Sequence, residues 1–174
     1  ITDWAGFNAY FAKMSSLGIV ASMKDFYWDL RPKPEYGTVE IRVCDTPLSI
    51  ETAVALAAYA QTLSKYFMEN RELQPAQETY LTYSYNRFQA CRFGLHGAFI
   101  NPITGTQSSI QEDILPTVAL IADAAEALGT SDAIALLRQR IQTQGDATWL
   151  LTSYEKSGSL SDVVRQQSNV WMGR

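Results

Sequence analysis

The sequence predicts an α+β protein that is mostly helical and contains an antiparallel hairpin. Apolar residues recur at helical spacing over most of the chain, and glycines separate the helical runs of its last third. One early region differs, because two segments rich in aromatic and β-branched residues, 25–31 and 37–45, flank the turn-forming segment 32–36. Hydrophobic residues make up 47% of the 174 residues, so the chain can bury a core.

Charge and composition exclude several classes of function. Fourteen Lys and Arg against eighteen Asp and Glu leave a net charge of −4, so no general positive field attracts nucleic acid. Polar residues interrupt every apolar run before the roughly 18 to 20 residues of a membrane span, and we expect no membrane partner. Two cysteines without a CxxC pattern and a single histidine exclude a disulfide framework and the common structural zinc sites. A cytoplasmic location is therefore predicted.

The first half of the chain is predicted to hold a helix, the hairpin and a longer helix. Asp3 can cap a helix that runs to about Met14 and stops near Gly18. The hairpin follows, with its turn at 32–36. Thr46 and Pro47 are typical of a helix start, and an Ala-rich helix is expected from Ile50 to about Met68.

The second half is predicted to be helical apart from one short hairpin. A helix is expected from Glu78 to Phe93, and turn signals within 94–109 predict a small hairpin-like loop. The remaining helices are expected at 111–128, 131–144, 147–156 and 161–171. Because no repeat or linker is visible, residues 1–174 are predicted to pack as a single unit.

The predicted hairpin raises a structural question, because two strands do not form a stable sheet alone. Either the hairpin joins strands that this chain does not contain, or it lies directly on the chain's own helices. The sequence leaves both possibilities open.

Charged residues gather on one face of the predicted hairpin. Side chains alternate between the faces of a strand, so Glu40 and Arg42 share a face with Thr38 and Cys44. The alternate residues Val39, Ile41 and Val43 are expected to face the core. In the other predicted strand, Asp29 and Arg31 fall together with Tyr27, so four charges are expected on one sheet face: Asp29, Arg31, Glu40 and Arg42.

This charged face has two interpretations. It could be a solvated surface on which cross-strand ion pairs contribute only a few tenths of a kcal/mol each. It could instead bind a polyanion and its metal ion, because carboxylates suit Mg²⁺ and arginines bind phosphates or carboxylates with two hydrogen bonds.

A second polar cluster falls in the segment 85–94. Arg87 and Arg92 stand about 140° apart on a helix, so one helix cannot direct both at the same ligand. A surface arginine is as consistent with the spacing as a ligand contact. His96 lies beside the helix end with no spacing that suggests a catalytic triad, and we expect a loop or surface role.

Two motifs carry a resemblance to a known family. Residues 25–48 contain the pattern W-D-x-R-P followed by G-T-V-E-x-R-V-x-D-T, and residues 86–95 read N-R-F-Q-A-C-R-F-G-L. Both closely resemble the glutamate-cysteine ligase type 2 family of bacterial carboxylate-amine ligases, and the resemblance extends over nearly the whole chain.

The resemblance implies a fold similar to glutamine synthetase, in which a curved antiparallel sheet holds nucleotide, metal and amino acid on its concave face. Members of the family are about twice as long as this chain. The chain, which begins at Ile1, is therefore expected to be the C-terminal half of a longer catalytic domain. Residues 25–45 would form an active-site hairpin within the larger sheet, and residues 46–174 the helical part.

The resemblance also implies an activity: an ATP-dependent ligase that joins a carboxylate to an amine through an acyl phosphate. The expected cofactors are ATP and Mg²⁺. The expected partners are glutamate, cysteine or another amine, the N-terminal half of the same protein, and a second subunit in a homodimer. The alternative is a non-catalytic helical module that serves interaction or dimerisation within a larger protein.

Residue roles follow from the resemblance position by position. Glu40 resembles a metal-binding glutamate, and Arg42 resembles an arginine that contacts the transferred phosphate. Arg31 is expected to contact phosphate or a substrate carboxylate, and with Arg42 it forms the predicted catalytic pair. Asp29 would orient Arg31 or a metal-bound water, while Asn86 and Arg87 would contact nucleotide or substrate.

Overall fold

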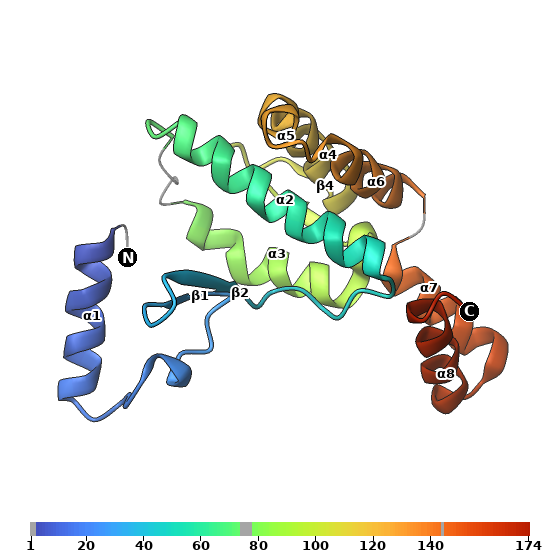
Figure 1. Ribbon diagram of the computed structural model, residues 1–174, viewed down its shortest axis with the longest axis horizontal. Helices are drawn as coiled ribbons and strands as arrows, with labels where there is room; N and C mark the ends of the chain where they lie inside the picture. Colours follow the sequence, from blue (N-terminus) through green and yellow to red (C-terminus); the bar gives the residue numbers. More distant parts are fainter. Residues whose placement is uncertain (1–2, 74–77, 144) are drawn as a thin grey trace. The chain divides into compact units, whose positions relative to one another are not determined.

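The computed structural model describes residues 3–73, 78–143 and 145–174 (Figure 1). The chain divides into two compact units, one comprising Ile1–Thr46 and the other Pro47–Arg174. The division falls next to the predicted boundary between hairpin and helical part. The described elements are mostly helical with two short antiparallel hairpins, which confirms the α+β class.

The first unit contains a helix, a 3₁₀ turn and a hairpin. Helix α1 (Trp4–Ser16) begins as predicted, because the Asp3 carboxylate accepts a hydrogen bond from the Gly6 N–H at 2.7 Å. The 3₁₀ helix η1 (Met23–Asp25) is held by a reciprocal capping box between Ser22 and Asp25. Strands β1 (Leu30–Lys33) and β2 (Thr38–Ile41) then pair antiparallel.

An aromatic cluster forms the core of this unit. Phe7 of α1 is buried with Val20, Met23 and Phe26, and Trp28 packs against the cluster from the segment before β1. The ring centroids of Phe26 and Trp28 lie 4.4 Å apart. These rings tie the chain between η1 and β1 to helix α1.

The first strand is shorter and lies later in the chain than predicted. The prediction placed it at 25–31, but Asp25 is used in the capping box, and Pro32 and Lys33, which were assigned to the turn, belong to the strand. Proline is tolerated here because the hairpin has only two strands, so the missing N–H can face outward. The turn instead centres on 34–37, where Gly37 adopts a φ of +62° that other residues rarely take.

The second unit begins with helix α2 (Ile50–Glu69), which starts where predicted. Its cap is Ser49, whose hydroxyl accepts from the Thr52 N–H, rather than Thr46. Helix α3 (Thr79–Phe93) leads through the 3₁₀ helix η2 (Gly94–His96) into the second hairpin, β3 (Ala98–Ile100) and β4 (Gln107–Ser109). This hairpin confirms the turn prediction for 94–109.

The remaining helices are close to their predicted positions, with one exception. The predicted helix 111–128 is two helices, because the chain leaves helical geometry at Ile121, which is fully buried in the core. The predicted end of the next helix at Gln144 lies outside the described residues. The helices are α4 (Ile110–Leu120), α5 (Ala122–Leu128), α6 (Ser131–Gln142), α7 (Asp146–Ser157) and α8 (Leu160–Trp171).

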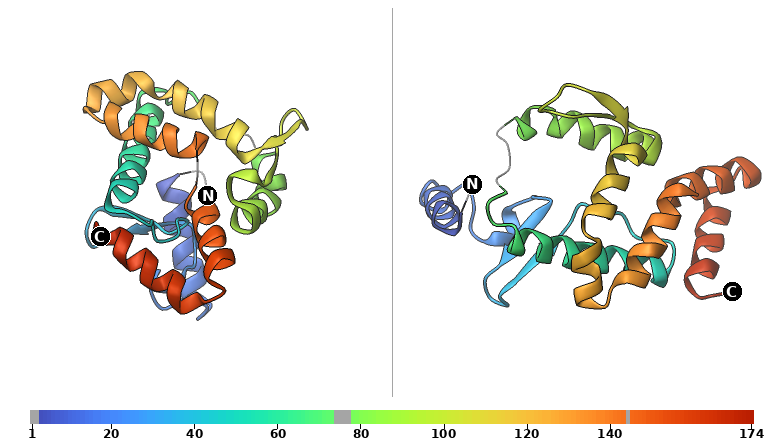
Figure 2. Two further views of the ribbon diagram at one scale, coloured as in Figure 1. Left: turned by 90° about the vertical axis from the view of Figure 1, so that its right-hand side faces the viewer. Right: turned by 90° about the horizontal axis from the view of Figure 1, so that it is seen from above.

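The core of the second unit lies between α2 and the helices α4, α5 and α6. Ala55 of α2 packs with Val118, Ile121, Ile134 and Leu137. Figure 2 shows α4 to α6 beside α2, and α7 and α8 side by side after them. No helix in the described ranges is long and apolar enough to cross a membrane.

Candidate functional site

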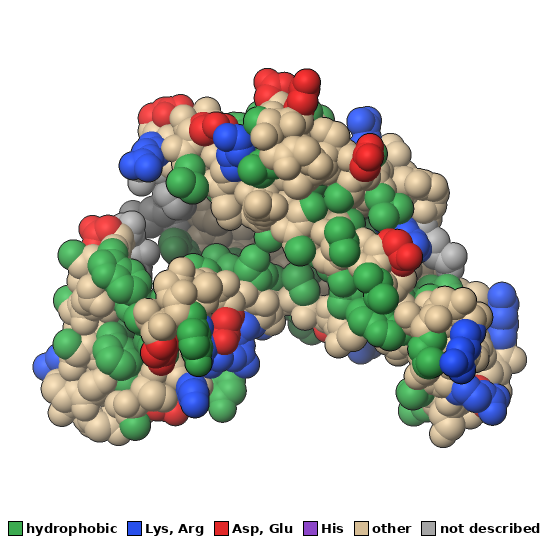
Figure 3. Space-filling view, in the orientation of Figure 1, with side chains coloured by type: hydrophobic (Ala, Val, Ile, Leu, Met, Phe, Trp, Pro, Cys, Tyr) green, Lys and Arg blue, Asp and Glu red, His purple; other side chains and the backbone are tan. Residues whose placement is uncertain are grey.

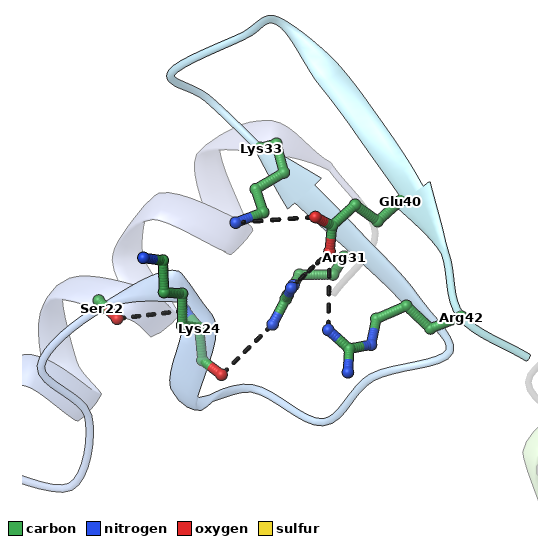
Figure 4. A network of polar contacts seen from close by, with 6 residues as sticks. All are labelled: Ser22, Lys24, Arg31, Lys33, Glu40 and Arg42. Carbon is green, nitrogen blue, oxygen red and sulfur yellow. Dashed lines mark hydrogen bonds and ion pairs between the residues drawn. The ribbon is translucent and has the colours of Figure 1, made fainter.

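The hairpin of the first unit gathers charged side chains around Glu40. In the register of the two strands, Arg31 lies directly opposite Glu40. The Arg31 guanidinium donates to Glu40 Oε2 from Nε at 2.8 Å and from Nη2 at 2.5 Å. Its Nη1 donates to the backbone carbonyl of Lys24 at 3.3 Å. Arg31 is therefore held at all three nitrogens, as Figure 4 shows.

Two further cations face the same carboxylate (Figure 4). Lys33 Nζ lies 3.7 Å from Glu40 Oε1, and Arg42 Nη1 lies 3.7 Å from Oε2. The exposed fractions of the side chains differ: 9% for Arg31, 11% for Lys33 and 39% for Arg42. Arg42 is thus the most accessible of the three cations around Glu40.

The cations keep Glu40 ionised. The hydrogen bond from Arg31 is the largest cause, and the charges of Arg31, Lys33 and Arg42 add to it, so the pKa of Glu40 lies below its ordinary value. The carboxylate therefore remains negative through the neutral range. One negative charge is surrounded by three positive ones.

The strand pairing confirms that Arg31, Glu40 and Arg42 gather on one side of the hairpin, but within this chain the more buried side is the charged one, contrary to the prediction. Within the described chain, Arg31 is only 7% exposed, whereas Val39 is 61%, Ile41 48% and Val43 54% exposed. The aromatic rings before β1, which were expected in the strand, instead pack on α1. The charged side is the one that meets η1, because Arg31 donates to the Lys24 carbonyl there.

Asp29 contributes through its backbone. Its carbonyl accepts a hydrogen bond from the Arg42 N–H at 2.7 Å, which continues the hairpin pairing one step past β2. This contact fixes the backbone of Arg42 next to Glu40. The predicted role of the Asp29 side chain stays a prediction.

Asn86 lies in the second unit, where its side chain holds the second hairpin. Its amide nitrogen donates to the Ile100 carbonyl at 2.9 Å, and its amide oxygen accepts from the Ile100 N–H at 2.9 Å. One turn further along α3, Gln89 accepts from the Ala98 N–H at 3.2 Å. Asn86 and Gln89 therefore fasten β3 to α3.

The charged residues of the second motif lie at the surface of the second unit. Arg87 and Arg92 are exposed on α3, and His96 is exposed in η2, as expected for a loop or surface histidine. Both cysteines are free and exposed. A ligand role for Asn86 and Arg87 stays a prediction.

Comparison with known proteins identifies the family. The model of "Glutamate-cysteine ligase family 2 (GCS2)" matches residues 1–166. This chain belongs to the glutamate-cysteine ligase family 2. The expectation drawn from the two motifs is thereby confirmed.

Three relatives named "Putative glutamate--cysteine ligase 2" illustrate the similarity. The protein of Janthinobacterium sp. (strain Marseille) is 78% identical over 175 aligned positions, and that of Herminiimonas arsenicoxydans is 76% identical over 173. The protein of Chromobacterium violaceum is 57% identical over 173. These alignments cover 99 to 100% of this chain but only 46 to 47% of each relative. The chain thus spans about half the length of these members of the family.

The described residues do not form a metal site by themselves. No group of three or more His, Cys, Asp or Glu side chains that could hold an ion occurs among them. Glu40 is a single carboxylate with three cations around it, and these cations repel a further positive ion. The metal role of Glu40 stays a prediction.

Two residues that make contacts in these regions, Lys33 and Gln89, were not singled out from the sequence. Lys33 was placed in a turn because Pro32 was taken to end the strand, yet it shares the buried face with Arg31. Extending the strand by two residues would have found it through simple alternation. Gln89 gave no signal, because its contact with β3 depends on how the hairpin folds back onto α3.

Proposed function

We propose that this chain supplies one wall of the active site of an ATP-dependent carboxylate-amine ligase that resembles glutamate-cysteine ligase. Family membership supports ligase activity. The observation that carries the proposal is the arrangement of the hairpin. There, the accessible Arg42 lies beside the fixed ion pair of Arg31 and Glu40.

The proposed reaction has two steps. A substrate carboxylate attacks the γ-phosphate of ATP, which gives an acyl phosphate and ADP. The amine then attacks the acyl carbon, and inorganic phosphate leaves as the amide bond forms. Phosphoryl transfer depends mainly on positioning and on neutralising the charge of the phosphate oxygens. Arg42 is suited to this task because it is accessible and its backbone is fixed by Asp29.

The other predicted residues take supporting roles in this proposal. Arg31 positions Glu40 and adds positive charge behind Arg42. Glu40 holds Arg31 and faces Arg42, and because three cations surround it, the oxygens around the Mg²⁺ that accompanies ATP would come from phosphates, water and other parts of the protein. When bound, Mg²⁺ would neutralise phosphate charge. Asn86 and Arg87 are proposed to act near nucleotide or substrate, with Asn86 acting through the hairpin that it fastens.

We further propose that the rest of the full-length protein completes the site and covers apolar surface of this chain. Within the described residues, no residue of α3 is buried, and even its large apolar side chains are open: Leu81 is 79% and Phe88 58% exposed. Hydrophobic side chains are also visible over much of the face in Figure 3. One covering partner would be the other half of the full-length protein, whose strands would join the hairpin in a curved sheet like that of glutamine synthetase. The other would be a second subunit.

The proposal is tested with the full-length protein by measuring ADP release in the presence of Mg²⁺, ATP, glutamate and cysteine. Arg42→Ala is expected to lower turnover about a hundredfold or more, because it removes charge stabilisation from the transferred phosphate. Arg165→Ala, which removes an exposed arginine paired with Asp162 on α8, is the matched control and should keep full activity. Unchanged turnover in Arg42→Ala would remove the arginine from the mechanism.

A second candidate is a non-catalytic interaction module, favoured by the exposed apolar residues of α3. The two candidates differ in nucleotide binding. Full-length protein that binds no ATP by calorimetry, with or without Mg²⁺, supports the interaction module. A screen of amino acids and amines for ADP release would define the substrates of the ligase.

A further inference from the structure

Lys33 occupies an unusual position for a lysine. It lies in β1 on the same face as Arg31, and only 11% of its side chain is exposed. In Figure 4 the ammonium group points toward the Glu40 carboxylate, which Arg42 approaches from a different direction. Lysine is seldom buried to this extent unless its charge has a partner.

Glu40 is an incomplete partner for Lys33. The distance of 3.7 Å between Nζ and Oε1 exceeds the 2.7–3.2 Å of an N–H···O hydrogen bond, so the ammonium does not donate to the carboxylate. Arg31 already donates two hydrogen bonds to the other oxygen of Glu40. With one negative charge against three positive ones, the cluster carries an excess of two positive charges.

We propose that Lys33 binds an oxyanion of the substrate, a phosphate or a carboxylate group, together with Arg42. An oxyanion would accept the N–H groups of Lys33 that Glu40 leaves unused and would balance the excess charge. It can approach where the site is open, because the side chains of Glu40 and Arg42 are 37% and 39% exposed. This assignment rests on the proposed ligase function, since both ATP and the amino-acid substrates carry such groups.

Calorimetry of the full-length protein tests the assignment with three probes: inorganic phosphate, ATP without divalent metal, and glutamate. Lys33→Met is expected to weaken binding of at least one probe about tenfold or more, as expected for the loss of a charge-assisted hydrogen bond. Loss confined to phosphate and ATP identifies a phosphate as the ligand, and loss confined to glutamate identifies a carboxylate. Lys33→Arg should retain most of the affinity.

The matched control is Lys13→Met, which removes the same charge from the exposed end of α1 and should bind each probe as the parent does. A thermal melt without ligand separates binding from a purely structural role. Because Lys33→Met removes a cation from a cluster with excess positive charge, its melting temperature should equal or exceed that of the parent. If Lys33 had a purely structural role, Lys33→Met would lower the melting temperature. Should Lys33→Met fail to fold, Lys33→Gln serves the same comparison.

The assignment is overturned if the parent binds none of the three probes, or if Lys33→Met binds all of them as the parent does. Either result leaves the ligase proposal to be decided by ADP release. If Arg42→Ala still abolishes turnover while Lys33→Met has normal affinity, the ligase function stands and the role of Lys33 falls. If ADP is never released but Lys33→Met loses phosphate affinity, the oxyanion site stands without the ligase.

Discussion

At the scale of single residues, the charged cluster of the hairpin shows how one carboxylate can organise several cations. Glu40 accepts two hydrogen bonds from Arg31 and lies within ion-pair distance of Lys33 and Arg42. Arg31 is largely covered while Glu40 is 37% exposed, so the pair is only partly shielded from solvent. Arg42 lies beside this pair and is 39% exposed.

The lowered pKa of Glu40 predicts how the stability of the first unit depends on pH. Because the carboxyl group binds its proton less readily in the folded chain, its contribution is complete above the ordinary value of 4.5 and is lost as the pH falls through the lowered pKa. Glu40→Gln should remove this part of the acid dependence in urea unfolding at a series of pH values. Glu35→Gln, an exposed change in the turn, should keep it. Parallel pH curves for parent and Glu40→Gln would contradict the prediction.

At the scale of elements, the second hairpin depends on contacts with α3. The side chains of Asn86 and Gln89 form hydrogen bonds with backbone N–H and C=O groups of β3. Gly97 has no side chain, which allows the backbone before β3 to pass close to α3. The hairpin has only three residues in each strand, so its own pairing is weak. Its stability therefore comes from these attachments.

Asn86→Asp tests the first attachment. The substitution keeps an oxygen for the Ile100 N–H but replaces the donor that faces the Ile100 carbonyl with a second acceptor. We expect a loss of about 1–3 kcal/mol in the free energy of unfolding and faster hydrogen exchange at the Ile100 amide. Asn101→Asp keeps the oxygen that accepts from the Ile103 N–H, so it should change little. Unaltered exchange at Ile100 would refute the attachment.

Gly97→Ala tests the close approach. A Cβ at this position would lie 2.6 Å from the backbone oxygen of Gln89, and neither backbone can move freely. We expect a loss of about 2–3 kcal/mol, measured by urea unfolding. Gly105→Ala serves as a control for backbone strain, because φ is +70° there but no atom lies within 4 Å, and its cost should be about 1 kcal/mol. Equal losses in the two variants would argue against the steric explanation.

At the scale of the whole molecule, exposed apolar surface supports the proposal that further protein contacts this chain. The apolar face of the first hairpin and the residues of α3 are both exposed in the described chain. The relatives are about twice as long, so additional chain is expected to cover these surfaces. Exposed strand edges and apolar faces otherwise favour aggregation.

Val39→Lys tests this conclusion by comparing two lengths of protein. In the 174-residue chain the substitution should change the free energy of unfolding by less than about 0.5 kcal/mol, because Val39 is exposed. In the full-length protein it should reduce soluble yield and ADP release, because the lysine would be buried. Tyr36→Lys in the exposed turn should be tolerated in both. Equal tolerance of Val39→Lys in both lengths would show that the face stays open.

Much of the fold could be predicted because it depends on local spacing. Asp3, the apolar spacing of α2 and the turn signals of 94–109 act over a few residues, and each led to the right element. The break at Ile121 could not be predicted, because it depends on packing between helices distant in the chain. In the site, the alternation of side chains along the strand correctly placed Glu40 and Arg42 on one face. Lys33 was not placed there, because the predicted strand ended at residue 31.

The sequence by itself determined the elements, the hairpin and the motifs that resemble the ligase family, because hydrogen bonding and side-chain alternation follow from neighbouring residues. Only the tertiary structure decided which face of the hairpin is covered. The rings of Phe26 and Trp28 pack on α1 rather than extending the strand, and the two β1 residues that are buried are the charged Arg31 and Lys33. Likewise, only the fold directs the amide of Asn86 to the backbone of β3. Such choices depend on contacts between segments far apart in the sequence.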